Sequence, residues 1–302
     1  MNTADLSLFI RIVETGSITE SAKQLGITTA AASSALRRLE NQLDIQLLIR
    51  TTRQLRITPE GEKFLYHCRQ ALDSLEKGRR SAHEQKGNIS GELRFSVSSD
   101  LGRNLVFHWV DEMMEKYPTL AIDLNVSDSL SNFFQDQVDV ALRYGKPEDS
   151  SMVAFHIASL NRITCAAPSY LAEYGKPSHP EELRKHNCLL YRLDGRLFNS
   201  WEYINGFANH KVKVSSDRVS NDTDIVRRWA VAGKGIAYRS QIDIASDLRS
   251  GRLVQILSEY QSPPVELYLI CPSRKQVTPA VIAFREMLRE KCTRLINATA
   301  FD

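Results

Sequence analysis

Residues 17–40 read SITESAKQLGITTAAASSALRRLE and predict two helices joined by a tight turn. Ser17 to Glu20 fits a capping box, in which the serine caps a helix start and the glutamate reaches back toward it. Gly26 follows at the position where a left-handed residue ends a helix. The stretch therefore predicts a helix-turn-helix near the start of the chain.

The second of these helices has two different faces. Its inward stripe is Ala32, Leu36, Leu39 and Leu43, and its other face carries Thr29, Ala30, Ser33, Ser34 and Arg37. A helix with short polar side chains on its exposed N-terminal half can enter the major groove of DNA, where base edges are distinguishable. An ordinary helical hairpin on a domain surface fits the pattern equally well.

The residues after the hairpin favour DNA. Residues 47–50 and 55–57 flank 51–54 and predict a short β-hairpin, the wing of a winged helix, with Arg53 near its tip. A wing beside a reading helix usually touches the DNA backbone or the adjacent minor groove, where arginine serves well. The predicted DNA contacts are Thr28, Thr29, Ala30, Ser33, Ser34, Arg37, Arg38, Arg50, Thr51 and Arg53.

Composition and charge agree with this interpretation. The chain has 302 residues, so two or three domains are expected, and its net charge is +3. Residues 1–88 carry 13 Lys and Arg against 10 Asp and Glu, whereas the remainder is balanced at 26 of each. A basic N-terminal segment suits phosphate neutralisation, although a solvated basic face would have the same composition.

Other features of the sequence indicate the cellular compartment of the protein. No long apolar run predicts a membrane span, and the N-terminus lacks the pattern of a signal segment. Five cysteines without tight pairing suit reduced thiols. We therefore expect a cytoplasmic protein with no membrane partner.

A long helix is predicted after the wing. Thr58-Pro59 forms a cap followed by proline at the first helical position, and no further proline occurs before about Gln85. Leu65, Cys68, Leu72 and Leu75 recur at the spacing of a coiled-coil seam, which predicts a dimerisation helix. The alternative is that the seam packs on its own domain.

Beyond a polar, glycine-containing hinge at 87–91, strands and helices alternate. Strands are expected at 93–97, 120–126, 138–142, 163–167, 212–219, 235–238 and 265–271, and helices at 98–117, 127–135, 222–232 and 279–291. This order predicts parallel pairing with right-handed crossovers. Its length suits two α/β lobes with a cleft between them.

Seven motifs, in order along nearly the whole chain, resemble those of the LysR-type transcriptional regulators. They are residues 9–17, 33–40, 47–53, 57–61, 139–145, 167–188 and 232–236. There are departures: Thr29 stands where many members have Gln, and Ser34 where many have Arg or Lys. Leu48 replaces the usual Phe, and Ser240 a frequent Pro. The first two remove long hydrogen-bonding side chains, so different bases are expected to be read.

The resemblance implies a fold class and a function. The fold is α/β with an N-terminal winged helix-turn-helix at 1–58, a linker helix at 59–86, a hinge at 87–91, and a two-lobed, periplasmic-binding-protein-like effector domain at 92–302. Lobe I would be 92–162 with 266–302, and lobe II 163–265. The implied function is a sequence-specific transcriptional regulator controlled by a small molecule. Its partners would be double-stranded operator DNA, further copies of the chain as a dimer or tetramer, and RNA polymerase if it activates.

Ligands of open α/β sheets bind beyond the carboxyl ends of the parallel strands. Together with the resemblance, this rule assigns effector binding to Ser98, Ser99, Asp100, Ser127, Asp128, Arg143, Asn221, Asp222 and Tyr238. Ser98 and Ser99 at a helix start, with Arg143 nearby, favour a small organic acid. Asp100 argues against an anion, and each such residue is also an ordinary helix cap.

An enzyme and an architectural DNA binder are the alternatives. His156, His179 and His186 are too scattered to be metal ligands, and no nucleophile or phosphate-loop motif occurs. Cys165 and Cys188 have apolar neighbours and are expected to be buried structural thiols. We therefore expect no catalytic residue, metal or cofactor. DNA bending alone does not need a cleft, which argues against the architectural alternative.

Overall fold

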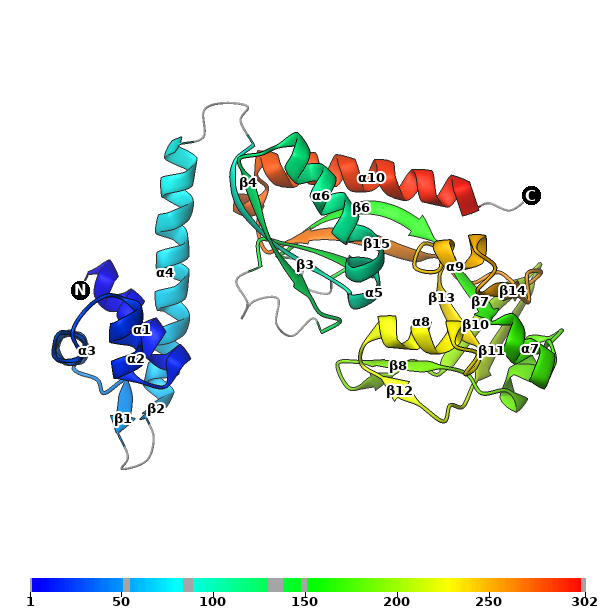
Figure 1. The fold of residues 1–302 in the computed structure, drawn as a ribbon, viewed down its shortest axis with the longest axis horizontal. Helices are drawn as coiled ribbons and strands as arrows, with labels where there is room; N and C mark the ends of the chain where they lie inside the picture. Colours follow the sequence, from blue (N-terminus) through cyan, green and yellow to red (C-terminus); the bar gives the residue numbers. More distant parts are fainter. Residues whose placement is uncertain (1, 51–54, 84–88, 130–137, 148–150, 300–302) are drawn as a thin grey trace. The chain divides into compact units, whose positions relative to one another are not determined.

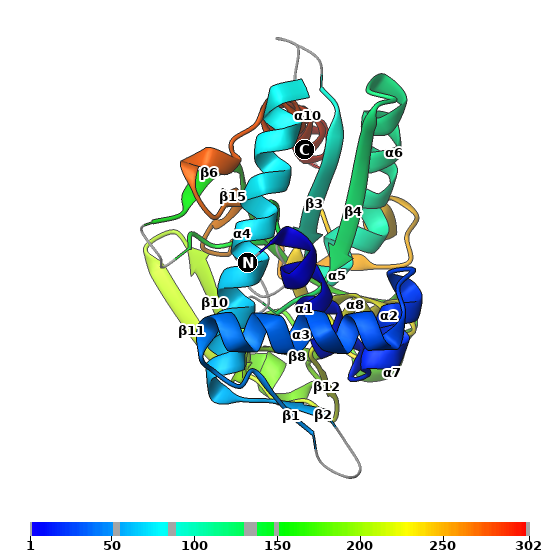
Figure 2. The same ribbon diagram turned by 90° about the vertical axis from the view of Figure 1, so that its left-hand side faces the viewer.

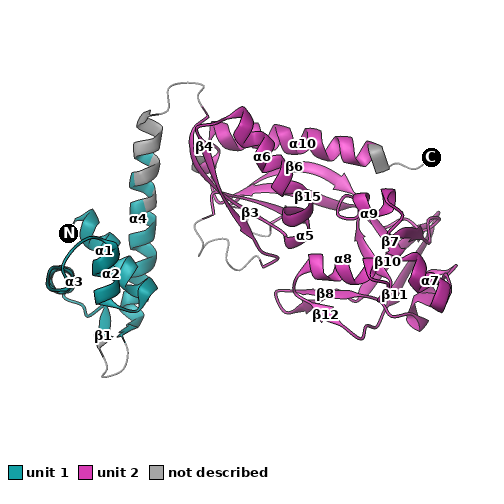
Figure 3. Ribbon diagram, viewed as in Figure 1, with its two compact units in different colours: residues 1–88 teal, residues 89–302 magenta. Residues whose placement is uncertain are grey.

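The computed structural model describes residues 2–50, 55–83, 89–129, 138–147 and 151–299. It divides into two compact units, residues 1–88 and 89–302 (Figure 3).

The N-terminal unit is a helical domain with a two-stranded wing. Its elements are α1 (Thr3–Thr15), α2 (Ile18–Gln24), α3 (Thr29–Leu43), β1 (Leu48–Arg50), β2 (Leu55–Ile57) and α4 (Pro59–His83). Phe9, Ile12 and Leu39 are fully buried where α1 and α3 meet. The inward stripe of α3 agrees with the sequence pattern, since Ala32 and Leu36 are also buried and Leu43 packs against the same core.

Local capping explains where the helices begin and end. The Ser17 hydroxyl accepts a hydrogen bond from the Glu20 backbone N–H at 3.3 Å. Thr28 caps α3 in the same way, accepting from the Ala31 N–H at 3.2 Å. Gly26 has φ +66°, the left-handed conformation expected between α2 and α3. The predicted helix-turn-helix is therefore confirmed.

The wing is an antiparallel pair in which Leu48 lies opposite Ile57. Thr58 joins it to α4, because its hydroxyl donates to the Gln46 carbonyl at 2.8 Å and accepts from the Gly61 N–H at 2.9 Å. A Cβ at Gly61 would lie 2.3 Å from the Leu47 carbonyl oxygen, so this position requires glycine. Thr51, Arg53 and the Arg50 side chain lie outside the described residues.

Helix α4 has the expected length, and its predicted seam is partly used within its own unit. Cys68 is only 2% exposed and belongs to the core of that unit, against which the half-buried Leu65 and Leu72 also pack. Leu75, at 58% exposure, is the most open of the four predicted seam residues. The dimerisation role of the seam stays a prediction.

The second unit contains two lobes. Lobe I has a sheet in the order β4-β3-β5-β15-β6, in which β3, β4 and β5 are parallel and β15 and β6 antiparallel. The strands are β3 (Gly91–Val97), β4 (Leu120–Val126), β5 (Val140–Tyr144), β6 (Val153–Leu160) and β15 (Val265–Cys271). Strand β3 thus begins within the predicted hinge. The predicted parallel pairing is confirmed for the first three strands.

Two helices cover one face of this sheet (Figures 1 and 2). Helix α6 (Phe107–Lys116) continues from α5 (Ser99–Leu101) through a π-helical segment, η1 (Gly102–Val106). Helix α10 (Pro279–Thr299) packs beside it, with Phe284 and Phe95 in edge contact at 4.6 Å between ring centroids. A short 3-10 turn, η3 (Arg274–Gln276), precedes α10.

Lobe II is built from shorter strands. Its sheets are β13-β7-β14, β12-β8-β9 and β10-β11. The strands are β7 (Arg162–Ala166), β8 (Leu190–Leu193), β9 (Arg196–Leu197), β10 (Ser200–Asn205), β11 (Ala208–Lys213), β12 (Val219–Ser220), β13 (Ala237–Ser240) and β14 (Val254–Ile256). The helices are α7 (Pro168–Tyr174), η2 (Pro180–Lys185), α8 (Thr223–Val231) and α9 (Ala245–Arg249).

The single strand predicted at 212–219 is wrong. Strand β11 ends at Lys213 and β12 begins at Val219. Between them, Ser216 accepts a hydrogen bond from the Arg218 N–H at 3.1 Å, a local serine turn that interrupts the extended chain. Most of the helix predicted at 127–135 lies outside the described residues.

Candidate functional site

A cavity of about 510 Å³ lies between the two lobes of the second unit. Lobe I contributes the ends of β3 and β5, and lobe II contributes β13 and the β8–β9 hairpin. Its wall comprises Ser98, Asp128, Arg143, Tyr144, Gly145, Arg162, Tyr191, Leu193, Asp194, Arg196, Phe198, Thr223, Tyr238, Arg239, Ser240, Asp243 and Val265. This volume is typical of small-molecule sites.

Arg143 places a buried cation at the cavity wall. Its Nη2 donates to the Ser96 hydroxyl at 2.7 Å and its Nη1 to the Leu142 carbonyl at 2.9 Å, but its Nε has no hydrogen-bond partner among the described residues. No carboxylate of the described residues lies within ion-pair distance. Burial lowers the pKa of Arg143 to about 10, so the guanidinium remains charged at neutral pH.

A second buried polar group at the wall also lacks a partner. The hydroxyl of Ser98 makes no hydrogen bond within the described part of the chain, although the residue is only 8% exposed. Buried polar groups in proteins are nearly always hydrogen-bonded, and leaving one unpaired is costly. Ser98 and Arg143 therefore offer donors that a bound molecule could use.

Ser99, the residue after Ser98, instead shares a set of hydrogen bonds with Asp128 and Thr223 that joins the two lobes, here called the latch. Its backbone N–H donates to Asp128 Oδ1 at 2.8 Å, and its hydroxyl lies 2.5 Å from Asp128 Oδ2. On the lobe II side, the Thr223 N–H and hydroxyl donate to the same Asp128 Oδ2 at 2.8 and 3.0 Å. Asp128 thereby joins the start of α5 to the start of α8.

A buried charge network lies beside the latch. Arg239 Nη2 is 2.5 Å from Asp100 Oδ2 and 3.3 Å from Asp243 Oδ2, so one cation sits between two carboxylates. Tyr144 donates to Asp243 Oδ1 at 2.6 Å. Burial, reinforced by repulsion from Asp243, raises the pKa of Asp100 to about 8. Burial also raises the pKa of Asp243.

Aromatic rings from lobe II complete the wall. Tyr191 and Phe198 stack at 4.7 Å between centroids, and Tyr238 stacks on Trp201 at 5.2 Å. The Tyr238 hydroxyl donates to the Glu202 carbonyl at 2.6 Å, which fixes the ring. The guanidiniums of Arg162, Arg196 and Arg239 lie over rings of this wall, so it combines aromatic surface with charge, which suits an organic ligand.

Four of the nine predicted effector residues line the cavity: Ser98, Asp128, Arg143 and Tyr238. The other five are not among its lining residues, and their assignment to effector binding stays a prediction. Ser99 and Asp100 are used in the latch and the charge network, and Asp222 caps α8 and pairs with Arg103 at 2.7 Å. The Ser127 hydroxyl accepts from the Ser129 N–H, and Asn221 is exposed.

Sequence reasoning missed most lobe II residues of the wall, including Arg162, Tyr191, Arg196, Phe198 and Arg239. They lie where the chain passes from lobe I to lobe II and on short antiparallel strands of lobe II. The rule for the ends of parallel strands does not apply there. The sequence does place arginines at the starts of some of these strands, but that pattern is not specific.

In the N-terminal unit, α3 presents the predicted groove-facing residues. Thr28, Thr29, Ala30, Ser34 and Arg37 are exposed and Ser33 is half-buried. Arg38 differs from them, because its Nη2 donates to the buried carboxylate of Asp5 at 2.6 Å. Arg38 therefore helps to hold α3 against α1.

Two protein-family models match the chain, one in each part. Residues 3–62 match the model of the bacterial regulatory helix-turn-helix protein of the lysR family, and residues 86–293 match the LysR substrate binding domain. The chain belongs to the LysR family of transcriptional regulators. Its winged helix binds DNA and its two-lobed domain binds a small-molecule effector, so it is an effector-controlled, sequence-specific regulator of transcription.

Several relatives of this LysR-type regulator span nearly its full length. It is 33% identical to the HTH-type transcriptional activator TtdR of Escherichia coli over 85% of this chain and 83% of that protein. It is 30% identical to DmlR of the same organism, a transcriptional regulator, over 95% and 93%. The full-length virulence activator AphB of Vibrio cholerae matches with a TM-score of 0.63 and 29% identity over 95% and 98%.

The structure also locates the cysteines of this LysR-type regulator. The thiols of Cys165 and Cys188 are fully buried, as predicted, and burial raises the pKa of each to about 12. In the described part of the chain, no three His, Cys, Asp or Glu side chains cluster as metal ligands. None of the described helices is both long and apolar enough to span a bilayer.

Proposed function

We propose that the cavity binds a small organic acid, whose carboxylate is held by Arg143 and Ser98. The observation that carries the proposal is that one cavity is lined by two buried donors without a partner among the described residues, the Arg143 Nε and the Ser98 hydroxyl. A carboxylate accepts hydrogen bonds from both donors and neutralises the guanidinium. Charge-assisted bonds of this kind are the strong ones in proteins.

The charge of the wall supports an anionic ligand. Four arginines line the cavity, Arg143, Arg162, Arg196 and Arg239, against three carboxylates, those of Asp128, Asp194 and Asp243. Asp128 is occupied by the donors of Ser99 and Thr223, and Asp243 by Tyr144 and Arg239. The stacked rings of Tyr191 and Phe198 would then contact the carbon skeleton of the acid.

Such a ligand would contact both lobes at once. It would therefore stabilise one arrangement of the lobes over others and shift the population of regulator geometries on DNA. We propose that α3 reads the operator with Thr29, Ala30, Ser33, Ser34 and Arg37, and that Leu75 contributes to a dimer. Cytoplasmic location, assembly as a tetramer and contact with RNA polymerase during activation are further parts of this proposal.

The ligand is tested by a thermal-shift screen of the full chain with small carboxylic acids and the corresponding neutral amides. We expect some acids to raise the unfolding temperature, and their amides to have no effect. Equal stabilisation by an acid and its amide would contradict the assignment. Sequencing of DNA fragments captured by the same protein would give the operator, and the genes beside it would narrow the choice of acid.

A further inference from the structure

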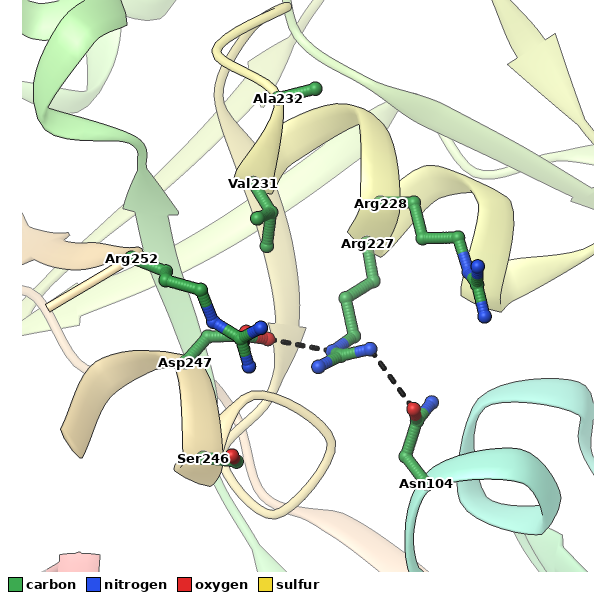
Figure 4. A pocket seen from close by; sticks show the side chains of 8 residues that line it. All are labelled: Asn104, Arg227, Arg228, Val231, Ala232, Ser246, Asp247 and Arg252. Carbon is green, nitrogen blue, oxygen red and sulfur yellow. Dashed lines mark hydrogen bonds and ion pairs between the residues drawn. The ribbon is translucent and has the colours of Figure 1, made fainter. Parts of the chain in front are cut away.

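A second cavity, of about 470 Å³, has its own set of lining residues and is drawn in Figure 4. Its wall is formed by Asn104, Arg227, Arg228, Val231, Ala232, Ser246, Asp247 and Arg252. Asn104 belongs to lobe I, whereas the others come from α8, α9 and the loop after each of them in lobe II. It shares no lining residue with the organic-acid cavity.

The charges at this second cavity are unbalanced. Three guanidinium groups line it, and Asp247 is its one lining carboxylate. Asp247 is fully buried and is divided between Arg227 Nε at 2.6 Å and Arg252 Nη2 at 2.7 Å. Figure 4 shows the guanidiniums of Arg227 and Arg252 turned toward this carboxylate. Asp224, which is not part of the wall, pairs with Arg228 at 2.7 Å and with Arg227 at 3.5 Å, so two carboxylates stand against three cations.

The arginines retain donors for a further anion. Arg228 uses only its Nε, which donates to Asp224 Oδ2 at 2.7 Å, and both of its terminal nitrogens lack an acceptor among the described residues. Arg227 Nη2 has no acceptor there either, although this side chain is only 10% exposed. Arg227 is thus a largely buried, partly unsatisfied cation held in a fixed orientation by Asp247 and Asn104.

We infer that this pocket is a binding site for a small phosphate-bearing anion, such as a phosphate monoester. Planar guanidinium forks match the oxygens of phosphate, and the three arginines outnumber the two carboxylates paired with them. Val231 and Ala232 are the apolar side chains among its lining residues. The inference does not depend on what occupies the organic-acid cavity.

The pocket is linked to the other cavity by consecutive hydrogen bonds. Arg227 Nη1 donates to Asn104 Oδ1 at 3.1 Å, Asn104 Nδ2 donates to Asp100 Oδ1 at 2.8 Å, and Asp100 pairs with Arg239. A bound phosphate would fix Arg227 and so favour the lobe arrangement that Asn104 holds. This gives a small phosphorylated molecule a route to influence the regulator.

Calorimetric titration of the full chain with inorganic phosphate, at constant ionic strength and pH, tests the site. Glycerol 3-phosphate, titrated separately, tests whether the space beyond the phosphate is used. We expect saturable binding that Arg252→Gln weakens about tenfold or more, the usual value of a charge-assisted hydrogen bond. Ala232→Glu, which adds a carboxylate to the wall, should also weaken it without removing any structural partner.

Two arginine variants serve as controls. Arg184→Gln removes an exposed lobe II arginine that pairs with Glu181 outside the pocket, and Arg143→Gln alters the organic-acid cavity. Both should bind phosphate like the wild type. Absence of saturable binding, or equal affinity in the wild type, Arg252→Gln and Ala232→Glu, would overturn the inference. Loss in Arg143→Gln but not in Arg252→Gln would also overturn it, because phosphate would then occupy the other cavity.

Discussion

Arg239 Nη2 lies 2.5 Å from Asp100 Oδ2, and this pair joins β13 of lobe II to α5 of lobe I. Both residues are almost completely buried, at 5% and 1% exposure. Asp243 shares the same guanidinium, so two largely buried carboxylates compete for one cation. Like charges in such a position favour retention of a proton.

The first prediction is therefore a pH dependence of stability. The pKa of Asp100 is raised to about 8 in the folded chain, against about 3.9 for an unfolded aspartate. Between these values the folded state binds a proton that the unfolded state has released, so this contribution to the free energy of unfolding falls as the pH rises. We expect calorimetric unfolding temperatures of the effector-binding unit to decrease from about pH 5 to pH 8.

Asp100→Asn should flatten this dependence, because an amide resembles the protonated carboxyl and does not titrate. Glu259→Gln, which changes an exposed carboxylate in the same unit, is the matched control. It should retain the wild-type dependence of unfolding temperature on pH. If Asp100→Asn and the wild type lose stability equally with rising pH, Asp100 does not carry the proton.

The second prediction separates two adjacent arginines of α3. Arg37 is exposed and proposed to contact DNA, so Arg37→Ala should reduce the slope of log affinity against log salt by about one. Its unfolding temperature should be unchanged. Arg38→Ala should lower the unfolding temperature of the N-terminal unit, because Asp5 is buried and would lose its partner. Salt-dependent DNA binding and thermal unfolding of both variants distinguish the roles, and the reverse pattern would refute them.

The third prediction concerns assembly through α4. Leu75→Asp places a charge on a side chain that is open in the single chain, so it should weaken the dimer without unfolding the winged helix. Cys68→Asp should instead destabilise the N-terminal unit, because the thiol lies in its core. Light scattering gives the mass and circular dichroism the fold. A full-sized assembly from Leu75→Asp would show that this residue faces solvent in the oligomer.

The parts of the fold that could be predicted are those determined by residues close together in the sequence. The caps at Ser17 and Thr28, the turn at Gly26 and the strand–helix order of lobe I follow from short-range patterns, and these agree with the structure. The serine turn at Ser216 was missed, although Ser215 and Asp217 beside it are typical of turns, because the valines on either side of the turn favour a strand. The heptad-like spacing that includes Cys68 could not reveal what buries this residue. A helix would present the same apolar stripe to a second copy of the chain or to its own domain.

The site was predicted only in part for a related reason. Ser98 and Asp128 follow parallel strands and Arg143 lies near the end of one, where position along the chain determines position at the sheet edge. Ser99 has the same local environment in sequence, yet Asp128 and Thr223 take up its hydrogen bonds. Whether a polar side chain meets a ligand or another lobe depends on long-range packing. Arg239 lies in the antiparallel strand β13, so the rule for the ends of parallel strands could not find it.

The central claim is that Arg143 holds the carboxylate of a small organic acid. Its most direct test is calorimetric titration of the wild type and Arg143→Gln with the acid that stabilises the wild type best, and with the neutral amide of that acid. We expect the acid to bind the wild type, to bind Arg143→Gln about tenfold or more weakly, and the amide to bind neither well. Equal affinity of both proteins for the acid, or tight binding of the amide, would contradict the claim.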